Sequence, residues 1–407
     1  MKEFNVPFRI LMGPGPSNVD PRVLRAMSQT MLSHLDPVFI RVMDDVQDGL
    51  RQVFRTRSPI TLPISGTGTA GMEAAMVNMI EPGDTVLVCT AGYFADRMAE
   101  IAERAGGRVQ RLEAPWGRVF EADQVRKAVD RHRPKVVAFV HVETSTGVSQ
   151  PIEPLAEVLN RDDIITIMDC VASLAGEPID VEGNGLDFVY SGSQKCLSCP
   201  PGLAPITLSE KAIRRLSTRT APVQSWYLDL AMLRKYWSEV RVYHHTAPIS
   251  LNYALREALR IIEEETLPRL YARHRLNHEA LVRGLEAMGL QMFVGKEARA
   301  WTVNTVKVPE GIDDQTVRTA LLERHGIEIV GGLGALKGQV WRIGLMGYSS
   351  NRNNVLLLLG ALEEILTELG CPSADGVQAA SRVYREAELA DSGRVSAFSE
   401  EKPVRVG

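Results

Sequence analysis

The stretch 136-VVAFVHVETSTGVSQPIEPLAEVLNRDDIITIMD-169 carries two apolar runs, residues 136–142 and residues 164–168, on either side of an amphipathic segment. Polar residues follow each run, with Glu143 after the first and Asp169 after the second. Strands of a parallel sheet are buried on both faces and are therefore continuously apolar, and a helix usually connects two of them. The stretch predicts a strand–helix–strand unit of an α/β fold.

The same alternation extends in both directions along the chain. Further apolar runs lie at 86–90, 187–191 and 204–208, and helical segments separate several of these runs. Repeated units of this kind build an open sheet covered by helices on both faces. We therefore expect a doubly wound α/β sheet in preference to a closed barrel.

The pattern changes after about residue 250. Two long helical patterns, LNYALREALRIIEEE (251–265) and HRLNHEALVRGLEAMG (274–289), precede short strand-like segments and a further helix. A smaller C-terminal α+β domain fits this part of the chain. The predicted organisation is an N-terminal arm (1–20), a large domain (21–250), a small domain (251–371) and a tail that is partly helical or mobile (372–407).

The composition argues against several classes of protein. The 407 residues carry a formal net charge of −4, which gives no attraction to nucleic acid or to an anionic membrane surface. The chain has no run of eighteen apolar residues, and its first residues lack the apolar core of a secretory signal. Its five cysteines do not form a disulfide framework. We expect a cytoplasmic protein with small-molecule substrates and neither a nucleic-acid nor a membrane partner.

Groups that can bind a ligand collect after five of the predicted strands. In open α/β sheets, ligands bind beyond the carboxyl ends of the strands. The sequence places there a glycine-rich turn that opens a helix, an aromatic ring, hydroxyl groups, a carboxylate and a lysine, in the order Gly66-Thr67-Gly68-Thr69, Phe94, Thr144-Ser145-Thr146, Asp169 and Lys195. Each group is common by itself, and the turn matches neither nucleotide-binding glycine motif.

Together these groups fit pyridoxal 5′-phosphate. Its phosphate needs a helix N-terminus with hydroxyl groups, and its ring needs an aromatic face. The ring nitrogen needs a carboxylate that keeps it protonated, and the aldehyde needs a lysine amine. Asp169 precedes Lys195 by enough residues for one crossover between adjacent parallel strands. The sequence therefore predicts that Lys195 and Asp169 are the catalytic pair.

Two cysteines directly after the lysine form a CxxC pair, Cys196 and Cys199. A zinc or redox site of this kind normally includes a second cysteine pair or a suitably spaced ligand pair. The sequence offers no such partner, and Pro200-Pro201-Gly202 follow at once. We therefore predict no metal site and interpret both cysteines as packing residues behind Lys195.

The sequence resembles the class V aminotransferases of fold type I, and within them the alanine–glyoxylate (serine–pyruvate) aminotransferases. The matching segments are GPGPSNVDPRVLRAM (13–27), SGTGTAGMEAAMVNMIEPGD (65–84), ETSTGVSQP (143–151), MDCVASLAG (168–176), YSGSQKCLSCPPG (190–202), YHHTAP (243–248), LNYALREAL (251–259), IEIVGGLG (327–334) and WRIGLMG (341–347). The resemblance implies a large domain with a mostly parallel, seven-stranded type of sheet between helices, and a smaller C-terminal α+β domain.

The resemblance implies a role for each matching position around the cofactor. Lys195 is the lysine that binds pyridoxal 5′-phosphate covalently, and Asp169 is the partner of the pyridine nitrogen. Phe94 stacks on the ring, where the family usually has a tryptophan. The phosphate-binding set is Thr67, Gly68, Thr69 and Gln194. Thr69 stands where the animal enzymes have a histidine, so the phosphate contacts differ in detail.

Other matching positions are implied to serve the substrate or the neighbouring subunit. Ser145 contacts cofactor and substrate, and Arg342 anchors the substrate carboxylate, a task that suits its bidentate fork. Tyr243 and Thr246 reach the phosphate from the neighbouring subunit, and Tyr243 also faces the substrate. The resemblance thus implies a homodimer with shared active sites, to which the N-terminal arm (1–20) contributes.

The expected reaction is ping-pong transamination between alanine or serine and glyoxylate or pyruvate. The main alternative is (S)-ureidoglycine–glyoxylate aminotransferase, a relative resembled by HLDPVF (34–39), PWGRVF (115–120), SQKCLS (193–198), YWSEVR (236–241) and QAASRVY (378–384). Those enzymes place an asparagine at the position of Tyr243 and a glutamine at that of His34. An amide recognises a ureido group better than a phenol or an imidazole, so alanine or serine is favoured.

Three more distant alternatives are weaker. Cysteine desulfurases share the layout but have a histidine just before the lysine, where this chain has Gln194. A cofactor-binding regulatory protein needs a fused DNA-binding segment, and neither end of the sequence offers a basic helix-turn-helix. A purely structural role does not account for the number of polar groups at the strand ends.

Overall fold

The computed structural model of the chain describes residues 5–371 and 375–399. Parts of the expected arm and tail, residues 1–4, 372–374 and 400–407, lie outside the described residues. The largest sheet has seven strands in the order β2-β10-β9-β8-β5-β3-β4. These strands are β2 (Thr61–Ser65), β3 (Thr85–Thr90), β4 (Arg108–Glu113), β5 (Val136–Val140), β8 (Ile165–Asp169), β9 (Phe188–Tyr190) and β10 (Leu203–Leu208). The prediction of an α/β fold with a mostly parallel sheet is confirmed.

β10 is the exception to the parallel arrangement. It runs antiparallel to both β2 and β9, although its sequence is as apolar as that of the other buried strands. Only the segment 191–202, which contains no helix, connects it to β9. Antiparallel neighbours need no helical crossover. This segment carries Lys195, so the lysine lies on a short connection that β9 anchors at one end and β10 at the other.

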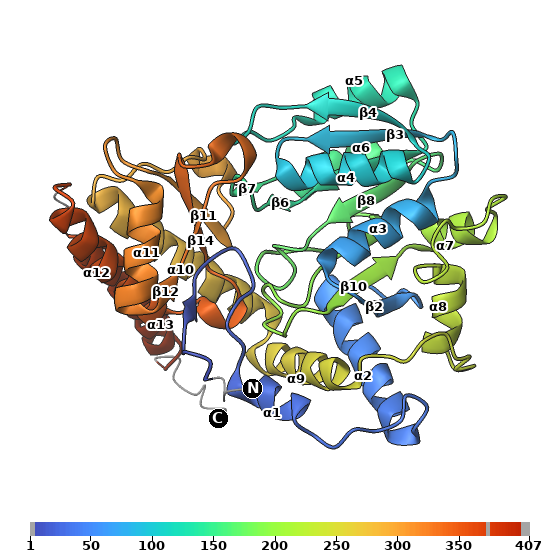
Figure 1. Ribbon diagram of the computed structural model, residues 1–407, viewed down its shortest axis with the longest axis horizontal. Coiled ribbons are helices and arrows are strands. Elements are labelled where there is room, and N and C mark those ends of the chain that lie inside the picture. Colours follow the sequence, from blue (N-terminus) through green and yellow to red (C-terminus); the bar gives the residue numbers. More distant parts are fainter. Residues whose placement is uncertain (1–4, 372–374, 400–407) are drawn as a thin grey trace, which may run out of the picture.

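Helices pack on the large sheet and along its edge (Figure 1). They are α1 (Pro21–Met27), α2 (Pro37–Phe54), α3 (Gly68–Met79), α4 (Tyr93–Arg104), α5 (Ala122–His132), α6 (Ile152–Leu159), α7 (Glu210–Ser217), α8 (Leu230–Trp237) and α9 (Ile249–Glu265). α2 illustrates how sequence makes them: Asp36 caps it through Val38 N, and Pro37 opens it. Its buried side chains recur at helical spacing, as in Phe39, Met43 and Leu50, and so form one apolar face.

A second, smaller core lies beside the large sheet. Its antiparallel sheet has the order β11-β14-β13, and helices α10 to α12 surround it. The elements are α10 (Leu267–Ala287), β11 (Val303–Lys307), α11 (Asp314–His325), β12 (Ile327–Glu328), β13 (Val330–Gly331), β14 (Val340–Gly344) and α12 (Arg352–Glu368), with 3-10 turns at Lys296–Ala298, Gly334–Leu336 and Gly347–Ser349. The N-terminal strand β1 (Ile10–Leu11) pairs with β12, and a short hairpin, β6 (Val142–Glu143) and β7 (Val148–Ser149), follows β5.

The expected tail contains one long helix, α13 (Gly376–Ser399), which packs against α10 and α12. Ala380 and Tyr384 of this helix belong to the small core, and Tyr384 Oη donates to Asn277 Oδ1 at 2.8 Å. Within the described ranges, no helix combines the length and the apolar character that crossing a membrane requires.

Candidate active site

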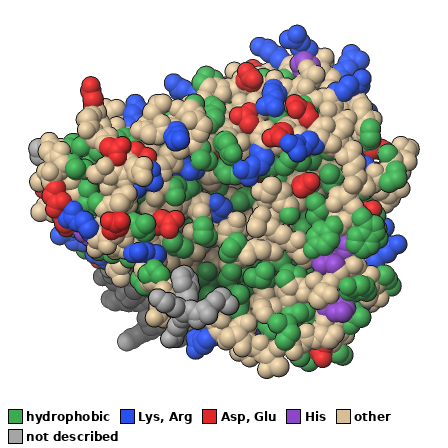
Figure 2. All heavy atoms as spheres, viewed as in Figure 1, with side chains coloured by type: hydrophobic (Ala, Val, Ile, Leu, Met, Phe, Trp, Pro, Cys, Tyr) green, Lys and Arg blue, Asp and Glu red, His purple; other side chains and the backbone are tan. Residues whose placement is uncertain are grey.

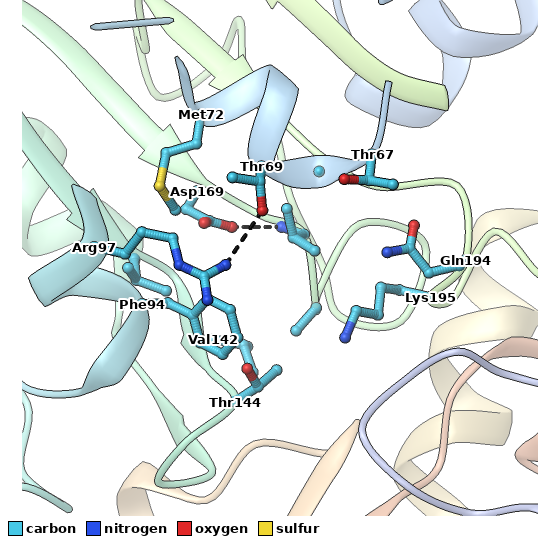
Figure 3. A pocket seen from close by; sticks show the side chains of 14 residues that line it. Thr67, Thr69, Met72, Phe94, Arg97, Val142, Thr144, Asp169, Gln194 and Lys195 are labelled. Carbon is cyan, nitrogen blue, oxygen red and sulfur yellow. Dashed lines mark hydrogen bonds between the residues drawn. The ribbon is translucent and has the colours of Figure 1, made fainter. Parts of the chain in front are cut away.

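Seven of the residues predicted for the site line one cavity at the carboxyl ends of the parallel strands (Figure 3). They are Thr67, Gly68, Thr69, Phe94, Asp169, Gln194 and Lys195. α3 begins on one side of the cavity, and the segment with Gln194 and Lys195 faces it from the other. Asp169 and the segment with Lys195 lie together because β8 and β9 are adjacent and parallel, and so end at the same edge of the sheet.

The start of α3 has polar groups available for an anion. Its N-cap residue Thr67 makes no side-chain capping hydrogen bond within the described part of the chain. Gly68 packs so tightly that a Cβ atom there would lie 3.1 Å from Val171 Cγ2. Opposite, Gln194 Oε1 is buried without a hydrogen-bond partner among the described residues, and turning the amide presents its NH₂ at that point. A phosphate at this helix N-terminus would use these free groups.

Lys195 is held against the N-terminal segment. Its Nζ donates to Pro14 O, and Ser17 Oγ donates to Lys195 O at 2.8 Å. Gly15 has a φ of 104°, and a Cβ atom built on it would lie 2.5 Å from Lys195 Nζ. Burial lowers the pKa of Lys195 to about 8, which increases the fraction of neutral, nucleophilic amine near neutral pH.

Asp169 ends β8 as a buried carboxylate with two donors. Its Oδ1 accepts from Val171 N at 2.8 Å and its Oδ2 accepts from Tyr190 Oη at 2.8 Å. Burial raises the pKa of Asp169 to about 6, against the lowering effect of these hydrogen bonds. A cationic group beside it, such as a protonated ring nitrogen, would supply the opposite charge that a buried carboxylate needs.

Arg97 lines the same cavity and was missed by sequence reasoning. Its guanidinium lies 4.9 Å from the centre of the Phe94 ring and 5.3 Å from that of Tyr93, and Nη1 donates to Thr69 Oγ1 at 3.2 Å. The sequence spacing could have indicated Arg97, since it follows Phe94 by three residues and residues three apart on a helix share a face. Arg97 therefore joins the aromatic wall of the cavity to the start of α3.

Ser145 and Arg342 do not line this cavity in the structure, although both lie close to its walls. Ser145 Oγ donates to Glu143 Oε1 at 2.6 Å. Arg342 is 6% exposed and donates from Nε to Gly331 O at 2.8 Å and from Nη1 to Thr144 O at 2.9 Å. Burial lowers the pKa of Arg342 to about 10, and across residues 5–371 and 375–399 it has no carboxylate at ion-pair distance. A substrate carboxylate would supply the ion-pair partner that Arg342 lacks.

Tyr243 and Thr246 lie on the exposed segment between α8 and α9 and do not line the cavity. Tyr243 is 55% exposed, and its ring centre lies 4.9 Å from that of His34. The two positions expected to distinguish the candidate donors, His34 and Tyr243, thus lie together. The role of Tyr243 and Thr246 in a neighbouring subunit stays a prediction.

The cysteines next to the lysine are free thiols, as are the other three cysteines. Cys196 and Cys199 are buried, and burial raises the pKa of each thiol well above its usual value. Such thiols are poor nucleophiles and poor metal ligands. In the part of the chain that the structure describes, no group of three or more histidine, cysteine or acidic residues is arranged to hold a metal ion.

The cavity fits pyridoxal 5′-phosphate group by group. Free donors at the start of α3 would hold the phosphate, the Phe94 ring face would contact the cofactor ring, and Asp169 and Lys195 would supply the carboxylate and the amine. Among the described residues, the Gln194 amide oxygen has no hydrogen-bond partner and the Arg342 guanidinium has no carboxylate partner, and ligands would supply both.

Comparison with known proteins gives one family. The family model of class V aminotransferases matches residues 10–355. An alanine–glyoxylate aminotransferase of Callithrix jacchus is 40% identical over 376 residues, which are 91% of this chain and 90% of that protein. The crystal structure of an alanine–glyoxylate aminotransferase from Nostoc sp. has a TM-score of 0.89 at 48% identity and covers 90% of this chain and 97% of its own. That of a ureidoglycine–glyoxylate aminotransferase from Bacillus subtilis has a TM-score of 0.93 at 41% identity, with 94% and 100% covered.

Proposed function

Because this chain belongs to the class V aminotransferase family, whose cofactor is pyridoxal 5′-phosphate, we propose that it transfers the amino group of alanine or serine to glyoxylate or pyruvate. The observation that carries the reaction is the meeting of Lys195, Asp169 and the start of α3 around one cavity. The Arg342 guanidinium, which donates to two backbone carbonyls but has no carboxylate partner among the described residues, supports substrates with one carboxylate to anchor.

In the proposed mechanism, each residue has one task. When bound, the cofactor supplies an electrophilic carbon and a ring that accepts the electrons released at the substrate α-carbon. Lys195 holds the cofactor between turnovers, and its Nζ takes the α-proton of the donor and later returns it as a general acid. Asp169 keeps a proton at the ring nitrogen. Arg342 holds the substrate carboxylate in place through its free guanidinium nitrogen. Exchange of the two keto acids at one site gives ping-pong kinetics.

The choice of alanine is supported by the alanine–glyoxylate aminotransferases of Callithrix jacchus and Nostoc sp., and the preference for alanine or serine over ureidoglycine by His34 and Tyr243. Their rings pack together, so both departures from the ureidoglycine enzymes act at one place. (S)-Ureidoglycine is the second candidate donor, because the Bacillus subtilis enzyme superposes with the higher TM-score and over more of this chain than the Nostoc enzyme.

The donor is tested on purified holoenzyme with glyoxylate or pyruvate as acceptor. Alanine, serine and freshly generated (S)-ureidoglycine are compared by kcat/KM under identical conditions. The proposal expects the higher values for alanine or serine. A higher value for ureidoglycine would replace the proposed donor and leave the aminotransferase assignment in place.

We also propose a cytoplasmic homodimer with shared sites. Its support is a group of exposed apolar side chains on and beside the segment that carries Tyr243: Trp226, Tyr227, Val240, Val242 and Tyr243. Figure 2 shows hydrophobic and histidine side chains gathered near α8 on the visible face. Exposed apolar patches of this kind mark protein interfaces. Sedimentation velocity tests it: a monomer of about the 44.9 kDa chain mass at micromolar concentration contradicts the dimer.

A further inference from the structure

The start of α4, which carries Phe94, is capped from a distant part of the chain. A helix begins with backbone N–H groups that lack partners within the helix. Gly92, the N-cap residue, has no side chain to bind them. Instead Phe94 N and Ala95 N both donate to Glu143 Oε2 at 3.2 Å, and Tyr93 N donates to Ser145 Oγ at 3.0 Å. The helix that bears the proposed stacking ring is thus fixed by the segment after β5.

The second oxygen of Glu143 fixes Ser145. Oε1 accepts from Ser145 N at 3.0 Å and from Ser145 Oγ at 2.6 Å. The side chain is 5% exposed, so water does not replace these bonds. The Glu143 carboxylate therefore anchors both the backbone of Phe94 and the side chain of Ser145, two residues predicted to contact the cofactor.

The neighbouring sequence makes room for this carboxylate. A Cβ atom at Gly92 would lie 2.4 Å from Glu143 Cγ and 2.7 Å from Ser145 Oγ. The backbone of Gly92 is extended, a conformation open to any residue, so the need for glycine here is one of space. Glu143 also faces the N-terminal end of the α4 dipole, which favours a negative charge.

We propose that Glu143 is a positioning residue that sets the Phe94 ring and the Ser145 hydroxyl for cofactor binding. The inference rests on the proposed function and on the predicted contacts of Phe94 and Ser145 with its cofactor. An amide cannot replace the carboxylate: in one orientation its NH₂ faces Phe94 N–H and Ala95 N–H, and in the other it faces Ser145 N–H. The first orientation sets a donor against the start of α4 and releases the backbone of Phe94, and the second sets a donor against Ser145 N–H and releases Ser145.

The test is the affinity of the Glu143→Gln variant for pyridoxal 5′-phosphate, measured by fluorescence titration of the apoenzyme, together with the visible circular dichroism of the bound cofactor. Loss of hydrogen bonds to a charged group predicts a Kd raised about tenfold or more and an altered dichroism band. An unchanged Kd and an unchanged band in the folded variant overturn the proposal.

Glu177→Gln is the matched control. Glu177 is also buried, burial raises the pKa of both Glu143 and Glu177, and Glu177 accepts from Ser149 Oγ at 2.7 Å and from Trp301 N at 2.9 Å. It does not line the cavity. The proposal expects this variant to lose thermal stability but to keep the wild-type Kd and dichroism. Equal effects of the two variants on Kd would show that Glu143 acts only through general stability, against the proposal.

A double-mutant cycle with Phe94→Leu separates positioning from other effects. If Glu143 acts through Phe94, Glu143→Gln raises the Kd of the Phe94→Leu variant by a much smaller factor than that of the wild type. Equal factors in both backgrounds contradict positioning through the Phe94 ring. If Glu143→Gln does not accumulate in folded form, Glu143→Asp decides, since a side chain shorter by one methylene no longer spans the four donors. Wild-type affinity in that variant contradicts positioning. Failure of the wild type to bind the cofactor would instead remove the proposed function.

Discussion

Tyr190 Oη donates to Asp169 Oδ2 at 2.8 Å, inside a fully buried part of the large sheet. The two residues are the last of β9 and β8, and the register pairs them directly. The phenol thereby fixes the rotamer of the carboxylate and lowers its pKa, while burial raises it. The large sheet thus places the Asp169 carboxylate at the cavity, and Tyr190 on the adjacent strand lowers the pKa of that carboxylate.

Tyr190→Phe should shift the acid limb of activity. Removing the hydrogen bond raises the pKa of Asp169, so the ionised carboxylate that holds the ring proton is lost at a higher pH than in the wild type. A hydrogen bond to a charged group corresponds to roughly one pH unit. The measurement is kcat/KM against pH. Tyr384→Phe, which loses a buried bond to Asn277 away from the cavity, should leave the profile in place. The same limb in Tyr190→Phe and wild type would contradict this role.

Lys195→Ala should abolish the visible absorbance of covalently bound cofactor and reduce kcat by at least about 10²-fold, because no other lysine of the described residues lines the cavity and could move the proton. Cys199→Ala serves as the control. Its thiol is buried and does not line the cavity, so the variant should retain both the band and most of the turnover. A Lys195→Ala protein with the wild-type absorbance would disprove the assignment, and a Cys199→Ala protein without turnover would reopen a role for the thiol.

Gly15→Ala should weaken cofactor binding, because the added methyl group would collide with the Lys195 side chain. The new Cβ atom would lie 2.5 Å from Lys195 Nζ, at a position where φ is 104°. Gly338→Ala is matched, since its φ of 74° is also positive but nothing lies within 4 Å of a Cβ atom there. Both variants should lose about 1 kcal/mol or more of unfolding free energy from backbone strain. Only Gly15→Ala should lose cofactor affinity, measured by titration; equal affinity in the two variants would show that the close approach has no consequence.

Mixed dimers test the shared site. Lys195→Ala lacks the amine, and a Tyr243→Ala/Thr246→Ala variant lacks the groups expected to act in the partner. Refolding equal amounts together should give mixed dimers with one intact site, and activity should approach about a quarter of wild type if half of the dimers are mixed. The parents refolded separately are the control. No recovery, with mixed dimers verified by mass spectrometry, would place Tyr243 and Thr246 outside the site.

The strand ends were predictable because their signal is local. An apolar run that closes on Asp169, or a glycine-rich turn that opens a helix, is visible within a few residues, and parallel strands bring their carboxyl ends to one edge. Seven of the predicted site residues therefore met in one cavity. The apolar run at 204–208 predicted a strand, but its antiparallel direction depends on the short connection from β9.

The sequence by itself determined which residue types stand at the strand ends, and so the class of cofactor they fit. Only the tertiary structure decided how those residues are held: Tyr190 against Asp169, Pro14 and Gly15 against Lys195, and Glu143 at the start of α4. The reason is physical. Periodicity records which face of an element is buried, whereas these contacts join residues far apart in the chain, and their hydrogen bonds exist only after the sheet, the helices and the N-terminal segment have packed.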